Sequence, residues 1–498
     1  MLKPTLMAAA VAAALLAPGA ASAVSDTEMK ELREQVLQLK EQYEKRIESL
    51  EQRLQQAEGA AQKAQGAAVN AEGVATTAAN VATKAEARSV KAESAAVQAG
   101  SRPVSEAAFN PAVSLILNGV YSNLSQDPAR FRITGFAPTG GDVAPGKRGF
   151  SLGESEIALA ANVDHYFRGT LIATLQPDNG IGVEEGYLQS LGLSNGFTLK
   201  AGRFYSSVGY QNEIHAHAWD FTDAPLANKV FLGNQLADDG LQLRWLAPTD
   251  TYFELGAEAG RGRRFPGSDR EKNGSGAANL FARLGGDIGA STAWRLGLSN
   301  LRTTAQNRNY NDFDSTGAEV NNSFNGASRL WVLDGILKWA PNGNRTDTNF
   351  KLQGEYFRRS EDGNLTYNSA NAAAFRGTST GTLRSAQSGW YAQGVYQFMP
   401  MWRAGYRYDR LNSGSVKLGQ VDSGALSAAD FPIYSRSNPT RNTLMLDFNA
   451  SEFSRLRLQF ASDKSRLGAT DKSRLGATDK QVFLQYIMSL GAHGAHNF

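Results

Sequence analysis

The 498-residue chain contains no cysteine, which excludes a disulfide framework, thiol catalysis and cysteine-bound metal. Beyond the N-terminus no apolar run approaches the roughly 20 residues that a membrane-spanning helix needs. The formal net charge is only +3, so we expect no nucleic acid partner. Gly-x-Ser-x-Gly, phosphate-binding glycine loops and His-Glu-x-x-His are also missing, so we expect no enzyme and no organic cofactor. Proline is scarce, with 15 residues against 50 glycines, 24 Phe and 16 Tyr, a balance that suits a large sheet with aromatic girdles.

The first 23 residues have the pattern of a secretory signal peptide. Lys3 precedes an apolar stretch from Leu6 to Leu16, and Ala21-Ser22-Ala23 forms a small-residue cleavage site. We therefore expect an exported protein whose mature chain begins at Val24.

Residues 24–99 have a helical pattern. Apolar residues follow a heptad seam with one four-residue stutter up to Ala57, after which alanine, replaced once by Ser89, occupies the seam for six heptads. This regularity predicts an oligomeric coiled coil, which would reach about 110 Å as one helix. A solvated spacer is the alternative, and Gly59, Gly66 and Gly73 favour it. Residues 100–111, with Pro103 and Pro111, form a predicted linker.

The remainder, 112–498, alternates polar and apolar residues as β-strands do. In one stretch Trp402, Ala404 and Tyr406 share a face opposite Arg403 and Arg407. A soluble sandwich would bury the apolar face, whereas a membrane barrel would turn it to lipid, and alternation alone leaves both open. Sixteen strands are predicted, at about 113–121, 152–163, 166–175, 183–191, 197–204, 239–247, 251–259, 278–287, 292–301, 329–339, 348–357, 389–398, 402–409, 441–449, 454–461 and 481–491.

The connections between these strands distinguish the two folds. Short turns follow the even-numbered strands, and long segments follow odd-numbered ones, at 205–238, 260–277, 302–328, 358–388, 410–440 and 462–480. Outer-membrane barrels sort their loops in this way, with short periplasmic turns and an even strand number. We therefore predict an all-β transmembrane barrel of about 16 antiparallel strands, preceded by the long α-helical coiled coil, which would lie in the periplasm.

The last predicted strand, followed by the terminal Phe498, carries a resemblance. Val482, Leu484 and Tyr486 share one apolar face of it, and the chain stops on an aromatic residue. This ending resembles the closing strand of bacterial outer-membrane barrels, which implies recognition of Tyr486 and Phe498 by the barrel-assembly machinery. An ordinary edge strand of a soluble sandwich is the alternative.

Six arginines lie on the face opposite the predicted lipid-facing side chains. We expect them to line the lumen, where unpaired positive charge would favour anions. Pairing with inward acids such as Glu154, Glu156 and Asp447 would instead give a neutral pore. The six are Arg244, Arg295, Arg403, Arg407, Arg455 and Arg457.

The third long segment, 205–238, is long enough to fold into the barrel and form its constriction. It contains His215 and His217, with Glu213 and Asp220 close by. Imidazole and carboxylate are zinc ligands, so these four residues are a candidate zinc site. The alternative is that the histidines only pack the loop against the wall.

The same loop carries a second resemblance. Gly202-Arg203-Phe204, His-Ala-His-Ala-Trp-Asp at 215–220 and Phe231-Leu232-Gly233 resemble outer-membrane barrels described as zinc-regulated and receptor-like, and Gly-Arg-Phe is also similar to phosphate-selective porins. The resemblance implies a Gram-negative outer-membrane uptake protein linked to zinc. The chain lacks the globular plug of energy-coupled receptors, because the coiled coil fills the space before the barrel.

These observations predict a trimeric porin for passive diffusion of small hydrophilic solutes, embedded in outer-membrane lipid. Zinc-linked uptake through His215 and His217 is one alternative. A structural tether, with the coiled coil binding peptidoglycan or another periplasmic partner, is the other.

Overall fold

The computed structural model describes residues 111–140, 143–175, 180–370, 377–466 and 478–491, together with positions 34, 41, 44 and 45, which are helical. The chain divides into two units, Met1–Thr77 and Ala78–Phe498, of which the second contains the sheet. The predicted signal peptide, the rest of the coiled coil, residues 100–110 of the linker and Phe498 lie outside the described residues. Among the described residues no helix is long and apolar enough to cross a membrane.

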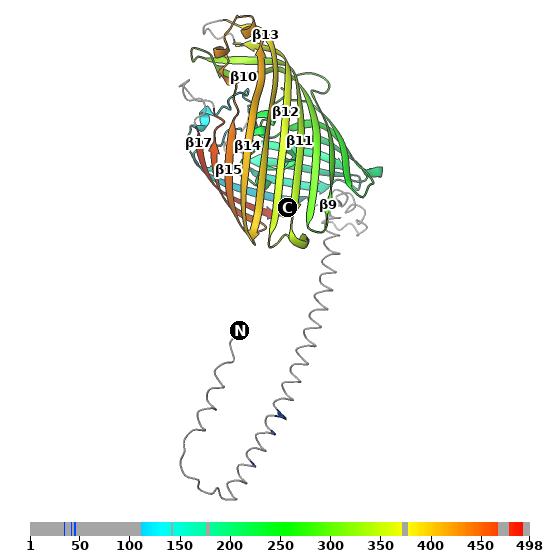
Figure 1. Cartoon of the computed structure of the whole chain (residues 1–498). Helices are drawn as coiled ribbons and strands as arrows, with labels where there is room; N and C mark the ends of the chain where they lie inside the picture. Colours follow the sequence, from blue (N-terminus) through cyan, green and yellow to red (C-terminus); the bar gives the residue numbers. More distant parts are fainter. Residues whose placement is uncertain are drawn as a thin grey trace, which may run out of the picture. The chain divides into compact units, whose positions relative to one another are not determined.

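All strands belong to one antiparallel sheet (Figure 1). They are β1 (Ala112–Leu124), β2 (Gly149–Leu152), β3 (Ser155–Asn162), β4 (Phe167–Leu175), β5 (Ile181–Ser190), β6 (Phe197–Tyr205), β7 (Ala237–Leu246), β8 (Tyr252–Gly260), β9 (Ala277–Ile288), β10 (Thr292–Phe313), β11 (Glu319–Trp339), β12 (Asn349–Tyr367), β13 (Ser379–Met399), β14 (Trp402–Leu418), β15 (Thr440–Ser451), β16 (Ser454–Asp463) and β17 (Asp479–Gly491).

The sheet closes on itself. β1 pairs with β17 on one side, from Ser114 opposite Gly491 to Leu124 opposite Gln481, and with β2 and β3 on the other. β2 and β3 are two halves of one wall strand interrupted at Gly153, where a Cβ would lie 2.6 Å from Asn118 Cγ. Counting them together gives sixteen wall strands, so the predicted closed barrel of 16 antiparallel strands is confirmed.

The distribution of side chains across the wall is inverted relative to a soluble protein. On β16, Leu456 and Phe460 point outward and are 42% and 50% exposed, whereas Arg457 and Gln459 point inward and are fully buried. An aliphatic and aromatic outer surface around a polar interior is the arrangement of a transmembrane barrel. The alternative of a soluble sandwich is therefore excluded.

Strands β10 to β14 are 17 to 22 residues long, much longer than predicted. The predicted loops 302–328 and 358–388 are therefore wrong, because most of their residues continue the strands. Residues 410–418 of the predicted loop 410–440 likewise extend β14. The prediction ended each strand where its outward apolar pattern ends, but a β-ladder is held by backbone hydrogen bonds and continues through polar residues. The connection from β10 to β11 is consequently a turn at 314–318, held by Asp314, and not a long loop.

The extended strands enclose an apolar cluster at the end of the barrel that carries the long loops, which we call the long-loop end. Inward side chains of the strands, including Phe324, Leu365 and Tyr367, pack there against Phe431 and Ile433 of the segment 419–439. That segment contains α4 (Gly419–Asp422), η7 (Ala428–Asp430) and η8 (Pro432–Tyr434). The opposite end carries the short connections, among them η3 (Ser194–Gly196) and η6 (Pro341–Gly343), and is called the turn end.

Candidate functional site

Residues 206–236, between β6 and β7, form a loop that folds into the barrel; we call it the inward loop. It contains η4 (Gln211–Glu213), η5 (Ala216–Ala218) and α3 (Leu226–Leu232). Asn212, fully buried, joins its two legs: the amide donates to Ser206 O and Leu236 O at 2.8 and 3.0 Å, and its Oδ1 accepts from Leu236 N at 2.7 Å. The loop therefore leaves and rejoins the wall at a fixed spacing.

The inward loop crosses the lumen and is bonded to distant strands. The guanidinium of Arg359 on β12 donates to Val230 O, and that of Arg457 donates to Trp219 O. Backbone N–H groups of the loop donate in turn to wall side chains: Tyr210 to Glu355 of β12 at 2.5 Å, Leu226 to Asp409 of β14 at 2.9 Å and Thr222 to Gln459 of β16 at 2.8 Å.

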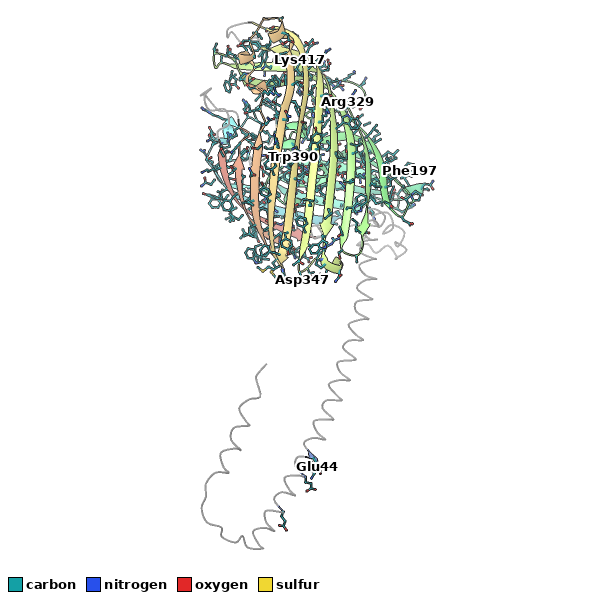
Figure 2. All side chains as sticks on the ribbon, viewed as in Figure 1. Glu44, Phe197, Arg329, Asp347, Trp390 and Lys417 are labelled. Atoms are coloured by element: carbon teal, nitrogen blue, oxygen red, sulfur yellow. The ribbon has the colours of Figure 1, made fainter. Side chains whose placement is uncertain are left out.

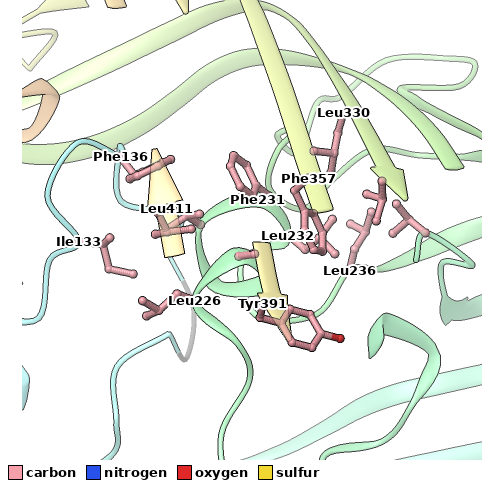
Figure 3. Packing of buried hydrophobic residues seen from close by; sticks show 14 of the residues in the cluster. Ile133, Phe136, Leu226, Phe231, Leu232, Leu236, Leu330, Phe357, Tyr391 and Leu411 are labelled. Carbon is pink, nitrogen blue, oxygen red and sulfur yellow. The ribbon is translucent and has the colours of Figure 1, made fainter. Parts of the chain in front are cut away.

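The helix α3 is buried along its whole length inside the barrel. Phe231 stacks on Phe357 of β12 with ring centroids 5.7 Å apart and meets Phe136 of the segment 125–148 edge-on at 5.8 Å (Figure 3). Gly389 of β13 allows this approach, because a Cβ there would lie 2.5 Å from Leu411 Cδ2 and 3.1 Å from Phe231 Cε2. Apolar packing therefore fills the lumen beside β11 to β14 at this level.

The acids of the inward loop pair with arginines of the wall. Asp223 binds Arg407 at 3.1 Å and Lys229 at 3.1 Å, and it also binds Arg441. Burial alone would raise the pKa of Asp223, but these three cations hold it well below its ordinary value. The loop is thus fastened by charge as well as by apolar contact.

All six arginines predicted to line the lumen are on the inner side of the wall, and each has an acid partner. Arg244 contacts Glu213 at 2.9 Å, Arg295 contacts Asp334 at 3.3 Å, Arg403 contacts Asp447 at 2.6 Å, Arg407 contacts Asp409 at 3.1 Å, and Arg455 and Arg457 contact Asp447 at 3.8 and 2.8 Å. Five of these pairs involve wall acids, the arrangement that the neutral-pore alternative described.

The structure separates the four residues of the predicted zinc site. Glu213 lies between Arg244 and Arg283; burial alone would raise its pKa, but the two arginines lower it to about 2. Asp220 pairs with Lys351 and Arg403. The expectation that these two carboxylates join the histidines assumed an extended loop, whereas the chain turns through η4 and η5 between them.

His215 and His217 instead meet an acid cluster on β3 and β5. His217 Nδ1 lies 2.7 Å from Glu156, and His215 Nε2 lies 2.9 Å from Glu185. The two rings are stacked with centroids 5.7 Å apart, and one donor atom from each of Glu156, His215 and His217 lies within 4.8 Å of the others. Glu184 adds a further carboxylate 3.3 Å from His215 Nδ1. We call these five residues the His–Glu cluster.

The charged atoms of the cluster face one another at close range. His215 Nδ1 and Glu184 Oε2 are buried 3.3 Å apart, and Glu156 lies 3.4 Å from the same nitrogen, without good hydrogen-bond geometry. Burial alone would lower the pKa of His215, but Glu156, Glu184 and Glu185 raise it well above its ordinary value, so the ring carries a proton at neutral pH. A divalent cation bound here would take the place of that proton. Its ligands would be imidazole and carboxylate groups, which first-row metals prefer.

Sequence reasoning found the histidines but not Glu184 and Glu185. The register between β4 and β5 shifts between Ile172 and Ala173, so the extra residue of a β-bulge places two consecutive carboxylates on the buried side. Glu156 was recognised as an inward acid, with arginine expected as its partner. No local signal in the sequence reports a bulge between two acids.

A cavity of about 300 Å³ lies between the histidines of the inward loop and the wall formed by β1, β3, β4 and β5. Its lining includes Glu156, Glu185 and Arg168 together with Tyr187 and Gln189. Arg168 and Gln189 are in register at the turn end of β4 and β5, so the cavity extends from the His–Glu cluster toward that end. The inward loop therefore fills one side of the lumen and leaves polar space on the other.

Known proteins similar to this chain include a sequence relative and several solved structures. No protein-family model matches it. A protein of Aquifex aeolicus strain VF5, named only as uncharacterized, is 30% identical over 416 residues, which cover 80% of this chain and 81% of that protein. Similar solved structures include in-vitro folded OmpT of Vibrio cholerae in trimer form, 12% identical with a TM-score of 0.46 over 76% of this chain and 99% of that one. OprB of Pseudomonas putida is 11% identical, with a TM-score of 0.43 over 77% and 94%.

Proposed function

We propose that this chain, which belongs to the same family as the uncharacterized Aquifex aeolicus protein, is a narrow porin-like channel for passive passage of small hydrophilic solutes. The proposal rests on the barrel itself. The inward loop is its constriction. The observation that carries this proposal is the cavity of about 300 Å³, lined by charged, polar and small apolar side chains, left between that loop and the wall of β1, β3, β4 and β5. Polar, charged linings that accept water and exclude bulky solutes are what a diffusion pore requires.

Selectivity in such a channel depends on the charges that remain unpaired. Each of the six predicted arginines has an acid within 4 Å, although Arg403, Arg455 and Arg457 share Asp447, so their field in the lumen is partly cancelled. The cavity itself sets Arg168 against Glu156 and Glu185. This balance favours weak selectivity over the anion preference that the arginines alone would give.

We place the channel in the outer membrane, with the short turns in the periplasm. The outward apolar surface supports the membrane location. β1 begins at the same end as the short turns, which supports the proposal that the predicted coiled coil lies in the periplasm. Assembly as a homotrimer is proposed from the predicted alanine-seamed heptads at 57–98.

Liposome swelling tests the channel. Proteoliposomes of the full chain should swell in small sugars and progressively less in larger ones, because the constriction limits solute size. A variant with residues 214–224 replaced by a Gly-Ser linker of equal length should admit larger sugars. Folded wild-type protein that passes no solute, with a loop variant that passes none either, would exclude the proposal.

A second function, metal-linked uptake, is favoured by the His–Glu cluster at the constriction. Glu156, His215 and His217 offer two imidazoles and a carboxylate, a donor set that fits zinc. His215 Nδ1 and Glu184 Oε2, which are buried 3.3 Å from each other, lie close enough to bind the same ion. These residues would hold the cation beside the passage, and the charge of the cation would neutralise the carboxylates around it.

Calorimetric titration of the folded protein with zinc tests this function. Binding should be lost when His215→Ala is combined with His217→Ala, and Glu156→Gln should weaken it. His165→Ala, at the exposed turn between β3 and β4, is the control and should leave binding unchanged. Equal zinc binding by wild type and the double variant would remove the metal-linked function and leave the channel untouched.

A further inference from the structure

The outer surface of the barrel carries a repeated pair of residues on its long strands. On three strands an outward arginine lies two residues beyond an outward aromatic residue, toward the long-loop end. The pairs are Trp331 and Arg329 on β11, Tyr356 and Arg358 on β12, and Tyr408 and Arg410 on β14. In Figure 2 Arg329 lies above Trp390, an outward residue of the same aromatic row.

The aromatic row marks the membrane boundary. On β11 the outward apolar stretch runs from Trp339 to Trp331, and on β13 it runs from Phe398 to Trp390. Each stretch has nine residues, the length with which a tilted strand spans the hydrocarbon core, and aromatic girdles flank such belts. The arginines one outward position further on therefore lie at the depth of lipid headgroups.

Positive charge accumulates in this region. Beyond the aromatic row, the outward cations of the described strands β10 to β14 are Arg302, Arg329, Arg358, Arg384, Arg410 and Lys417. The outward acids there are Asp362, paired with Arg384 at 3.0 Å, and Glu319 at the far end of β11. Arginine is the residue whose planar fork matches phosphate oxygens.

The same surface is hollowed. A depression of about 610 Å³ is lined by Arg302, Arg329 and Arg384, by Asp362, which pairs with Arg384, and by small residues that include Thr304, Ala327 and Ser360. Arg358 lies beside this lining, one outward position from Ser360 on β12. Arg302 and Arg329 face each other in register across β10 and β11, and Thr304 and Ala327 follow as the next outward pair. Small side chains beside the arginines leave room for a bulky anionic group.

We propose that this surface binds the phosphorylated headgroup of an outer-leaflet lipid, with Arg302, Arg329 and Arg358 as the phosphate-binding residues. Its acyl chains would lie on the apolar belt below, against Trp331 and Tyr356. The depth favours a lipid over a soluble anion, because only a lipid holds its phosphate at the membrane boundary and buries its tail at the same time.

Native mass spectrometry of the full chain in neutral detergent tests the proposal, with diphosphoryl lipid A and the same lipid without phosphates as probes. The phosphorylated lipid should bind at least about tenfold more tightly, and excess inorganic phosphate should not displace it. The triple variant Arg302→Gln, Arg329→Gln, Arg358→Gln should lose roughly a hundredfold in affinity for it. Lys147→Gln, Arg264→Gln, Lys272→Gln, which removes three exposed loop cations, is the matched control and should bind as wild type does.

Three results would overturn the lipid site. The first is equal binding of both lipids by wild type, and the second is wild-type affinity in the triple variant. The third is a loss of affinity in the control as large as that in the triple variant, which would indicate non-specific attraction. The wild-type comparison needs no variant, so the proposal stays testable even if the triple variant fails to fold. Displacement by inorganic phosphate would assign the surface to a free anion and also contradict it.

Discussion

Replacing Asp223 by alanine should release the inward loop from the wall. The carboxylate lies 3.1 Å from Arg407 and 3.1 Å from Lys229, also binds Arg441, and accepts from Gln459 at 3.2 Å. The three cationic side chains are at most 3% exposed. Asp223→Ala would leave them facing one another without their shared counter-ion.

The magnitude follows from the burial of these charges. Removing one partner of a buried ion pair costs about 3–5 kcal/mol, because the remaining charge stays desolvated. Since about 1.4 kcal/mol is a factor of ten, 4 kcal/mol shifts the equilibrium between docked and released loop by roughly a thousandfold. The barrel wall keeps its own hydrogen bonds, so the loop should detach while the sheet remains closed.

Because the chain has no cysteine, a single reporter thiol measures this opening. Ala227→Cys places it in α3, where residue 227 is fully buried. Maleimide labelling of the reporter should accelerate by up to roughly a thousandfold when Asp223→Ala is added. Asp239→Ala, which breaks the half-exposed pair with Arg203, is the control and should change labelling little. Equal labelling rates with and without Asp223 would refute the conclusion that charge pairing holds the loop.

Two further predictions concern the packing and the loops. Gly389→Ala should cost about 1–3 kcal/mol of stability, because the new Cβ meets Leu411 and Phe231, and the thermal unfolding temperature should fall accordingly. An unchanged melting curve would contradict the close approach of α3. Burial alone would raise the pKa of Asp430, but hydrogen bonds from Ser315 and other donors lower it to about 2, so its stabilisation is complete above pH 4 and is lost as pH falls through 2. Protease resistance of the segment 419–439 should therefore not decrease between pH 8 and pH 4, and a loss near pH 6 would show that another group controls it.

The sequence was sufficient to predict the barrel and the face that its arginines occupy. Alternation such as Leu456, Arg457, Leu458 is a local property, and closure follows once an even number of such strands is joined by short turns at one end. The lengths of β10 to β14 escaped prediction because their outer parts, such as Thr303 to Asn311, pair through the backbone without an outward apolar face.

The candidate site was predictable only in part. His215 and His217 stand out in a loop long enough to enter the lumen, but their partners lie on β3 and β5, and only the folded barrel brings Glu156 and Glu185 to them. The separation of Glu213 from the histidines depends on a wall arginine, Arg283, that no spacing in the loop encodes. Long-range pairing of this kind depends on the register of strands that the loop does not contain.

Single-channel current through the full-length protein in a planar bilayer tests the central claim most directly. The account predicts small conductance steps for wild type and larger steps for Asp223→Ala, because the inward loop sets the narrowest part of the path. A reversal potential near zero in a salt gradient would agree with the paired arginines. A bilayer that stays silent with well-folded protein of both forms would contradict the account, because neither the cavity nor the released loop would then provide a path for ions.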